Sequence, residues 1–140
     1  MVHSTSSEAR WQGLRALDPE AVENLYRFGR GKPSLLERLA RIFLDAVPAQ
    51  LAELHSALAE GDGGKLARVA HALKGGWQMA GALRFAELSA ELERCAKAGD
   101  VERWGGDLEA LEDEYVRVAA DFRDILAAIA SAPPADRGDA

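Results

Sequence analysis

The sequence of 140 residues contains a single cysteine, Cys95, and no long apolar run. One cysteine excludes an internal disulfide and any metal site built from several thiolates. No apolar stretch approaches the roughly 18 residues that a membrane-spanning helix needs, and residues 1–8 lack the apolar core of a secretory signal. We therefore expect no membrane segment and a cytoplasmic protein. Cys95 follows Phe85, Leu88 and Leu92 at helical spacing, which predicts a buried, unreactive thiol.

The sequence also has no excess of positive charge. Lys and Arg number 17 against 23 Asp and Glu, which gives a formal net charge of −6. Because contacts to nucleic-acid phosphates need a broad basic face, this balance argues against a nucleic-acid partner. The length fits one domain with one core.

Sustained alternation of apolar and polar residues, the mark of a half-buried strand, does not occur, so the sequence predicts an all-α protein. Apolar residues recur instead at steps of three and four. The expected helical segments are 11–17, 19–28, 35–58, 65–80, 82–98 and 101–129. Pro48 should kink the third of these. Gly75 could end the fourth at Lys74, but Trp77 and Ala80 keep to its apolar face and favour continuation.

Four long helices joined by short turns fold most simply as an antiparallel up-down-up-down four-helix bundle. We expect the short N-terminal helices to pack at one end of it. The predicted organisation is a flexible tail over residues 1–9, a bundle domain over 10–130 and a second flexible tail over 131–140.

The helix over 65–80 presents a histidine to solvent. Its apolar stripe consists of Leu66, Val69, Leu73, Trp77 and Ala80. His71 lies almost opposite this stripe, and the residues expected on its side of the helix are Ala67, Lys74, Gly75 and Gln78. Between Gly63 and Ala86 the sequence has four Lys or Arg residues and no Asp or Glu. This locally basic surface favours an anionic ligand or an acidic partner.

Most histidine chemistries lack their companion residues here. Neither His71 nor His55 has the glutamate three residues earlier that di-metal bundles use, and the His-Glu-x-x-His zinc motif is absent, so we expect no metal site. Serines lie outside any nucleophile-elbow context, and Gly61 to Gly64 lack the lysine and hydroxyl of a phosphate-binding loop.

The chemistry that remains is the imidazole as its own nucleophile. A neutral imidazole has a free lone pair, and phosphoryl transfer asks mainly for positioning and positive charge. Lys74, with its Cβ about 5–6 Å from that of His71, could steady the phosphoryl oxygens. Gly75 would clear space beside the ring, Gln78 could donate a hydrogen bond, and Ala67 and Arg68 would complete a docking surface.

The run from His71 to Gly75, preceded by Ala70 and followed by Gly81-Ala82 and Leu83, resembles the signature of histidine-containing phosphotransfer (HPt) domains. The resemblance covers roughly residues 18–129. It implies a module that accepts a phosphoryl group on His71 from a receiver-domain aspartate and passes it to another receiver, including receivers of hybrid histidine kinases. It further implies a monomer with no kinase activity and no cofactor, the magnesium ion being supplied by the receiver. Many members have two small residues where this chain has Gly76 and Trp77.

Two other functions remain open. The first is a bundle that docks receivers or kinases without accepting phosphate. The second is a kinase dimerisation domain, which the missing ATP-binding domain and nucleotide motifs argue against. His55 lacks a lysine or glycine at the matching offsets and is interpreted as an ordinary surface residue.

Overall fold

The computed structural model describes residues 10–29 and 34–131, and within this part of the chain every regular element is a helix. The all-α prediction is therefore confirmed. The helices are α2 (Pro19–Phe28), α3 (Ser34–Glu60), α4 (Gly63–Trp77), α5 (Leu83–Ala98) and α6 (Val101–Ser131). The expected tails lie outside the described residues, apart from Ser131, which is the last residue of α6.

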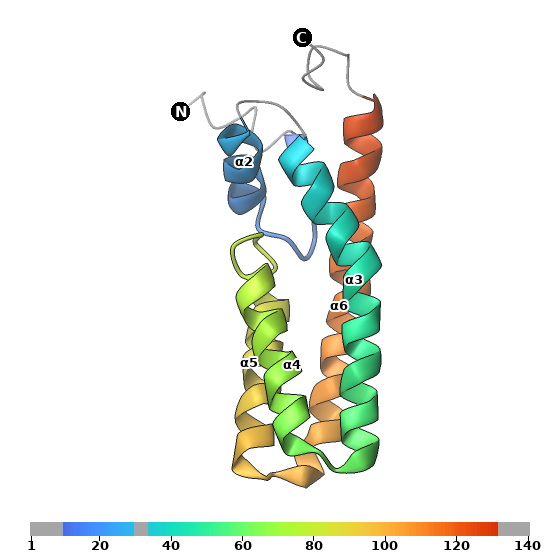
Figure 1. Ribbon diagram of the computed structural model, residues 1–140. Helices are drawn as coiled ribbons and strands as arrows, with labels where there is room; N and C mark the ends of the chain where they lie inside the picture. Colours follow the sequence, from blue (N-terminus) through green and yellow to red (C-terminus); the bar gives the residue numbers. More distant parts are fainter. Residues whose placement is uncertain (1–9, 30–33, 132–140) are drawn as a thin grey trace.

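The four long helices form a bundle in which each contacts the next along the chain and α6 packs back against α3. In Figure 1, α3 and α5 run down the page while α4 and α6 run up it. The much shorter α2 lies at the upper end, above the turn that joins α4 to α5, and contacts α3. This arrangement leaves the outward faces of α4 and α5 uncovered by α2.

An aromatic cluster at the centre of the bundle ties the four helices together. The ring of Phe43 on α3 is the hub, with neighbouring ring centroids 4.8–5.4 Å away. Those rings come from α4, α5 and α6 and belong to Trp77, Phe85, Tyr115 and Phe122. Aromatic rings at such separations contribute beyond the area that they bury. Trp77 thus lies in the core, as its place on the apolar stripe predicts.

Helix ends follow the expected local chemistry. Asp18 caps α2, accepting a hydrogen bond from the backbone N–H of Glu20 at 3.2 Å, with Pro19 in the first helical position. Asp62 caps α4 in the same way through the N–H of Lys65 at 3.0 Å. Each carboxylate satisfies an N–H that has no partner inside the helix, and an acidic cap suits the positive end of the helix dipole.

Residues 11–17 depart from the prediction, because they form a turn and bends rather than a helix. The carboxylate of Asp121, on α6 and 2% exposed, accepts hydrogen bonds from the backbone N–H groups of Arg15, Ala16 and Leu17 at 2.7–3.1 Å. These amides therefore bond to a side chain instead of to helical carbonyls. Hydrogen bonds to this one buried carboxylate therefore take the place of the helical hydrogen bonds expected there.

The prediction that α4 continues past Gly75 and Gly76 is confirmed, although the helix ends at Trp77 rather than at Ala80. The following turn contains Gly81 at φ +86°, where a Cβ would come 2.8 Å from that of Ala21 in α2. Its carbonyl oxygen accepts a hydrogen bond from the N–H of Asp18 at 3.0 Å. Only glycine suits this contact, which fastens α2 over the α4–α5 turn.

Candidate functional site

His71 lies in the middle of α4 with 64% of its side chain exposed, so the imidazole faces solvent as predicted. The apolar stripe on the opposite side of α4 explains this, because Leu66, Leu73 and Trp77 are buried in the bundle. A rigid, packed helix thus carries an accessible ring.

The ring is held by a carboxylate from the neighbouring helix. Nδ1 of His71 lies 3.0 Å from Oε2 of Glu93 on α5, and the Glu93 side chain is only 9% exposed. Because an ionised carboxylate only accepts hydrogen bonds, Nδ1 carries the hydrogen and donates it. In the neutral ring, the free lone pair is then on the other nitrogen, Nε2.

Glu93 also binds two lysines. Its Oε2 lies 2.9 Å from Nζ of Lys97, and its Oε1 lies 3.5 Å from Nζ of Lys74. The hydrogen bond from Lys97 is the main cause that lowers the pKa of Glu93 below its usual value of 4.5; burial opposes this, and His71 and Lys74 lower the pKa further. Glu93 is consequently ionised at neutral pH, and its buried charge is compensated from three directions.

Beside the ring, α4 leaves open space. Gly75, one turn after His71, is exposed, and a Cβ placed there would meet no atom within 4 Å. Packing within this chain therefore does not explain the glycine, although glycine weakens a helix by about 1 kcal/mol relative to alanine. Arg68, three residues before His71, is also exposed.

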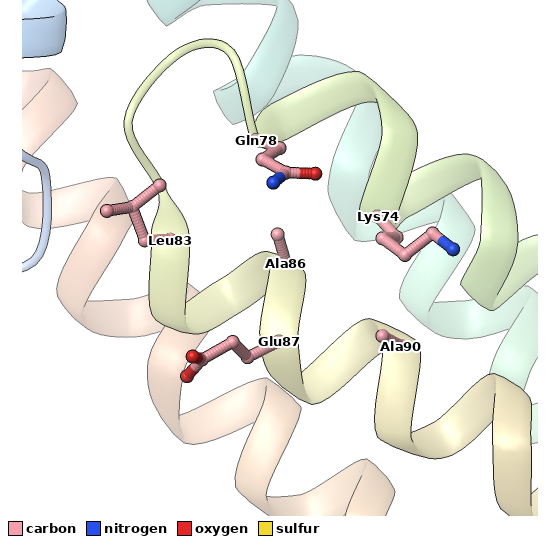
Figure 2. A pocket seen from close by; sticks show the side chains of 6 residues that line it. All are labelled: Lys74, Gln78, Leu83, Ala86, Glu87 and Ala90. Atoms are coloured by element: carbon pink, nitrogen blue, oxygen red, sulfur yellow. The ribbon is translucent and has the colours of Figure 1, made fainter.

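Gln78 and Lys74 line an open groove between α4 and α5, shown in Figure 2. The α5 side of the groove consists of Leu83, Ala86, Glu87 and Ala90. Leu83 in this lining is 48% exposed, and Met79, in the turn that follows α4, is 69% exposed. The groove therefore offers a partner both apolar surface and polar groups.

The prediction that Ala67 faces solvent is wrong, since this residue is only 7% exposed. Ala67 lies one turn after Gly63, where an added Cβ would come 3.1 Å from the backbone oxygen of Ala96 on α5. The small residues on this side of α4 let α5 approach closely and cover it. Ala67 belongs to the contact between the two helices and not to a docking surface.

Sequence reasoning missed Glu93 and Lys97. The interval between Gly63 and Ala86 contains no acid, but the fold brings Glu93, 22 residues after His71, against the ring. One signal was present, because Ala86, Ser89 and Ala96, which are buried, make with Glu93 a strip at steps of three and four along α5. Such a strip of small residues indicates a second packed face on that helix.

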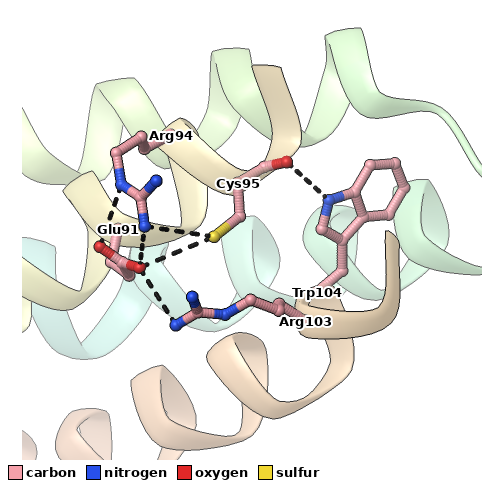
Figure 3. A network of polar contacts seen from close by, with 5 residues as sticks. All are labelled: Glu91, Arg94, Cys95, Arg103 and Trp104. Carbon is pink, nitrogen blue, oxygen red and sulfur yellow. Dashed lines mark hydrogen bonds and ion pairs between the residues drawn. The ribbon is translucent and has the colours of Figure 1, made fainter. Parts of the chain in front are cut away.

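Another polar cluster joins α5 to the start of α6. Among the described residues, Glu91, Cys95 and Asp107 have ligand-type atoms within 4.8 Å of one another. Glu91, however, is paired with both Arg94 and Arg103, and the indole N–H of Trp104 donates to the Cys95 carbonyl at 3.0 Å (Figure 3). Burial is the main cause that raises the pKa of the Cys95 thiol. The thiol is buried as predicted, and the cluster holds the two helices together.

Together these features define a helical bundle in which one face of α4 packs in the core and the other presents an exposed imidazole, held by a buried carboxylate. The Hpt domain family matches residues 38–121, and the chain belongs to that family. It is a histidine phosphotransfer protein of a phosphorelay.

A solved structure supports the assignment. The chain is similar to the crystal structure of histidine-containing phosphotransfer protein B (HptB) from Pseudomonas aeruginosa PAO1, at 29% sequence identity and with a TM-score of 0.72. The similarity covers 78% of this chain and 92% of that one. A comparison with curated proteins finds no match. Across the described residues, no helix combines the length and apolar character needed to cross a bilayer.

Proposed function

We propose that Nε2 of His71 is the phosphoacceptor atom and that the donor is the phosphorylated aspartate of a receiver domain. The observation that carries this proposal is the hydrogen bond between Nδ1 and Glu93, because in the neutral ring it makes Nε2 the nitrogen with the free lone pair. The exposure of the ring then allows in-line approach of a phosphoryl group.

In the transfer step, the Nε2 lone pair attacks phosphorus, the P–O bond of the aspartyl phosphate breaks, and its electron pair leaves with the aspartate carboxylate. The ring becomes positively charged, because Nδ1 keeps its hydrogen. The Glu93 carboxylate, 3.0 Å from Nδ1, stabilises this charge. The same step in reverse passes the group to the aspartate of a second receiver.

Lys74 is assigned to the phosphoryl oxygens. It lies one turn from His71, and its partly exposed ammonium group is 3.5 Å from Glu93, close to the reacting ring. Gly75 is assigned to the close approach of the receiver, while Arg68 and Gln78 contribute polar contacts around the ring. The exposed Met79 and Leu83 supply apolar contact area for the same partner.

Magnesium is assigned to the receiver. The residues around His71 do not suit this ion, which prefers carboxylate and water oxygens in octahedral geometry. The carboxylate that contacts the ring is already held by two lysines and by His71. We therefore propose that the protein needs no cofactor of its own. We further propose that it is a cytoplasmic monomer that works with receiver domains, including those of hybrid kinases.

The test is transfer of radiolabelled phosphate from a phosphorylated receiver domain. The native chain should gain an acid-labile, base-stable label, and His71→Gln should gain none. His55→Gln is the matched control, because His55 is also exposed and also bonded to a glutamate. Undiminished labelling of His71→Gln would refute the proposal. Binding of receivers that persists in His71→Gln, with no label on the native chain, would instead indicate a docking module.

A further inference from the structure

The carboxylate of Glu93 is shared unequally among its partners. Oε2 bonds both to Nδ1 of His71 and to Lys97, at 3.0 and 2.9 Å, while Oε1 has the longer contact of 3.5 Å with Lys74. Lys97 therefore contacts the same oxygen that orients the imidazole. Lys74, with the weaker contact, is the cation that Glu93 can release more easily.

Phosphorylation changes the charge balance around this carboxylate. A phosphoryl group brings about −1.5 to −2 charges, and it would attract Lys74, the lysine on the same helix as His71. Glu93, only 9% exposed, would then lose one of its compensating cations. A buried carboxylate left short of positive charge tends to take up a proton or to change its position.

We propose that Lys97 is a positioning residue, which keeps Glu93 ionised and directed at Nδ1 of His71 while Lys74 turns to the phosphoryl group. This inference rests on the proposed function and extends it to a residue four positions after Glu93 on α5. Lys97 reaches the imidazole only through Glu93 Oε2, on the Nδ1 side of the ring, so it does not serve as a phosphate ligand. Its side chain is 67% exposed and therefore does not pack in the core.

The experiment uses phosphoramidate, a small donor that phosphorylates imidazole directly with release of ammonia and needs no receiver. In Lys97→Met, the rate of His71 phosphorylation, followed by ³¹P NMR, should fall about fivefold. The ¹⁵N spectrum of the unphosphorylated protein should show part of His71 moving from the Nδ1–H to the Nε2–H tautomer. Lys97→Arg should restore both the rate and the tautomer.

Arg94→Met is the control, because it removes a cation from the same helix that is paired with Glu91 instead. Arg94→Met should leave both the phosphorylation rate and the tautomer of His71 unchanged. Thermal melts of all variants show whether a change in either one comes instead from a loss of helix stability. Native values in Lys97→Met, failure of the arginine rescue, or an equal loss in Arg94→Met would overturn the proposal. The proposed function fails separately, if receivers cannot label His71 while phosphoramidate still does.

Discussion

Two exposed histidines in the described part of the chain pair with a glutamate from another helix, yet only one of them, His71, has the surroundings of a reactive site. Nε2 of His55 on α3 lies 2.5 Å from Glu112 on α6, and Nδ1 of His71 lies 3.0 Å from Glu93. Their side chains are 54% and 64% exposed. The shorter contact belongs to the histidine to which we assign no function, so neither exposure nor a nearby carboxylate distinguishes the site.

What distinguishes His71 is the nitrogen that is bonded and the carboxylate that bonds it. Glu112 occupies Nε2 of His55, the nitrogen farther from the backbone, whereas Glu93 leaves that nitrogen of His71 free. Glu93 is 9% exposed and bound by two lysines, while Glu112 is 37% exposed. A buried, charge-compensated glutamate holds an imidazole in one orientation more firmly than a solvated one.

Among the substitutions that test this comparison of the two histidines, the one that fills the space beside His71 should change the transfer rate most. Gly75→Leu should reduce receiver-dependent phosphotransfer about thirtyfold, because the new side chain would occupy space needed by the partner at a cost of about 2 kcal/mol. The helix itself should become more stable, since leucine is a better helix former than glycine. Transfer kinetics and thermal melting of the same sample measure both changes.

Gly76→Leu is the matched control for this substitution. A Cβ at Gly76 also meets no atom within 4 Å, but the position is turned about 140° around α4 from His71. The Gly76→Leu variant should gain stability in the same way, while its rate of phosphotransfer stays near that of the native chain. Equal transfer in the two variants would contradict a docking role for Gly75.

A smaller effect is expected from neutralising the two glutamates in turn. Glu93→Gln should slow phosphorylation of His71 about tenfold, since a neutral amide loses the extra 1.4 kcal/mol or so that a charged partner gives to the developing imidazolium. Glu112→Gln should leave the rate unchanged. Single-turnover transfer from a phosphorylated receiver makes the measurement, and equal rates for the two variants would remove the distinction between the sites.

The smallest effect concerns stability and pH. Because the pKa of Glu93 is lowered in the folded state from 4.5, its ionised form contributes stability above that value, and this is lost as the pH falls through the folded-state pKa. Urea unfolding should show Glu93→Gln less stable than the native chain by about 1 kcal/mol at pH 7, and the difference should shrink steadily as the pH is lowered below 4.5. A difference that stays constant down to the lowest pH at which the chain is folded would show that the charge of Glu93 is not its cause.

The fold of this protein could be predicted largely from sequence, because its determinants are local. The stripe from Leu66 to Trp77 defines the buried side of α4 and therefore the exposed side that carries His71. Asp18 and Asp62 begin helices through contacts within three residues. Each of these features depends on spacing along one helix, which the sequence displays directly.

The rest of the site depends on how helices meet, and helical spacing does not specify that. Glu93 reaches His71 only because α5 lies close to α4, and the same approach buries Ala67. Residues 11–17 were wrongly predicted as helical for a similar reason, since Asp121 is more than a hundred residues away in the chain. Periodicity identifies a helix face but cannot identify which residue of another helix meets it.

The bond between Arg15 and Asp121 has a consequence for how the molecule comes apart. It joins residues 106 positions apart, whereas most helix contacts in the bundle join neighbours in sequence. Closing so long a loop is entropically unfavourable, so long-range contacts tend to form after local ones. The N-terminal segment should therefore be the last part to dock as the chain folds and the first to detach, while the helix carrying His71 stays intact.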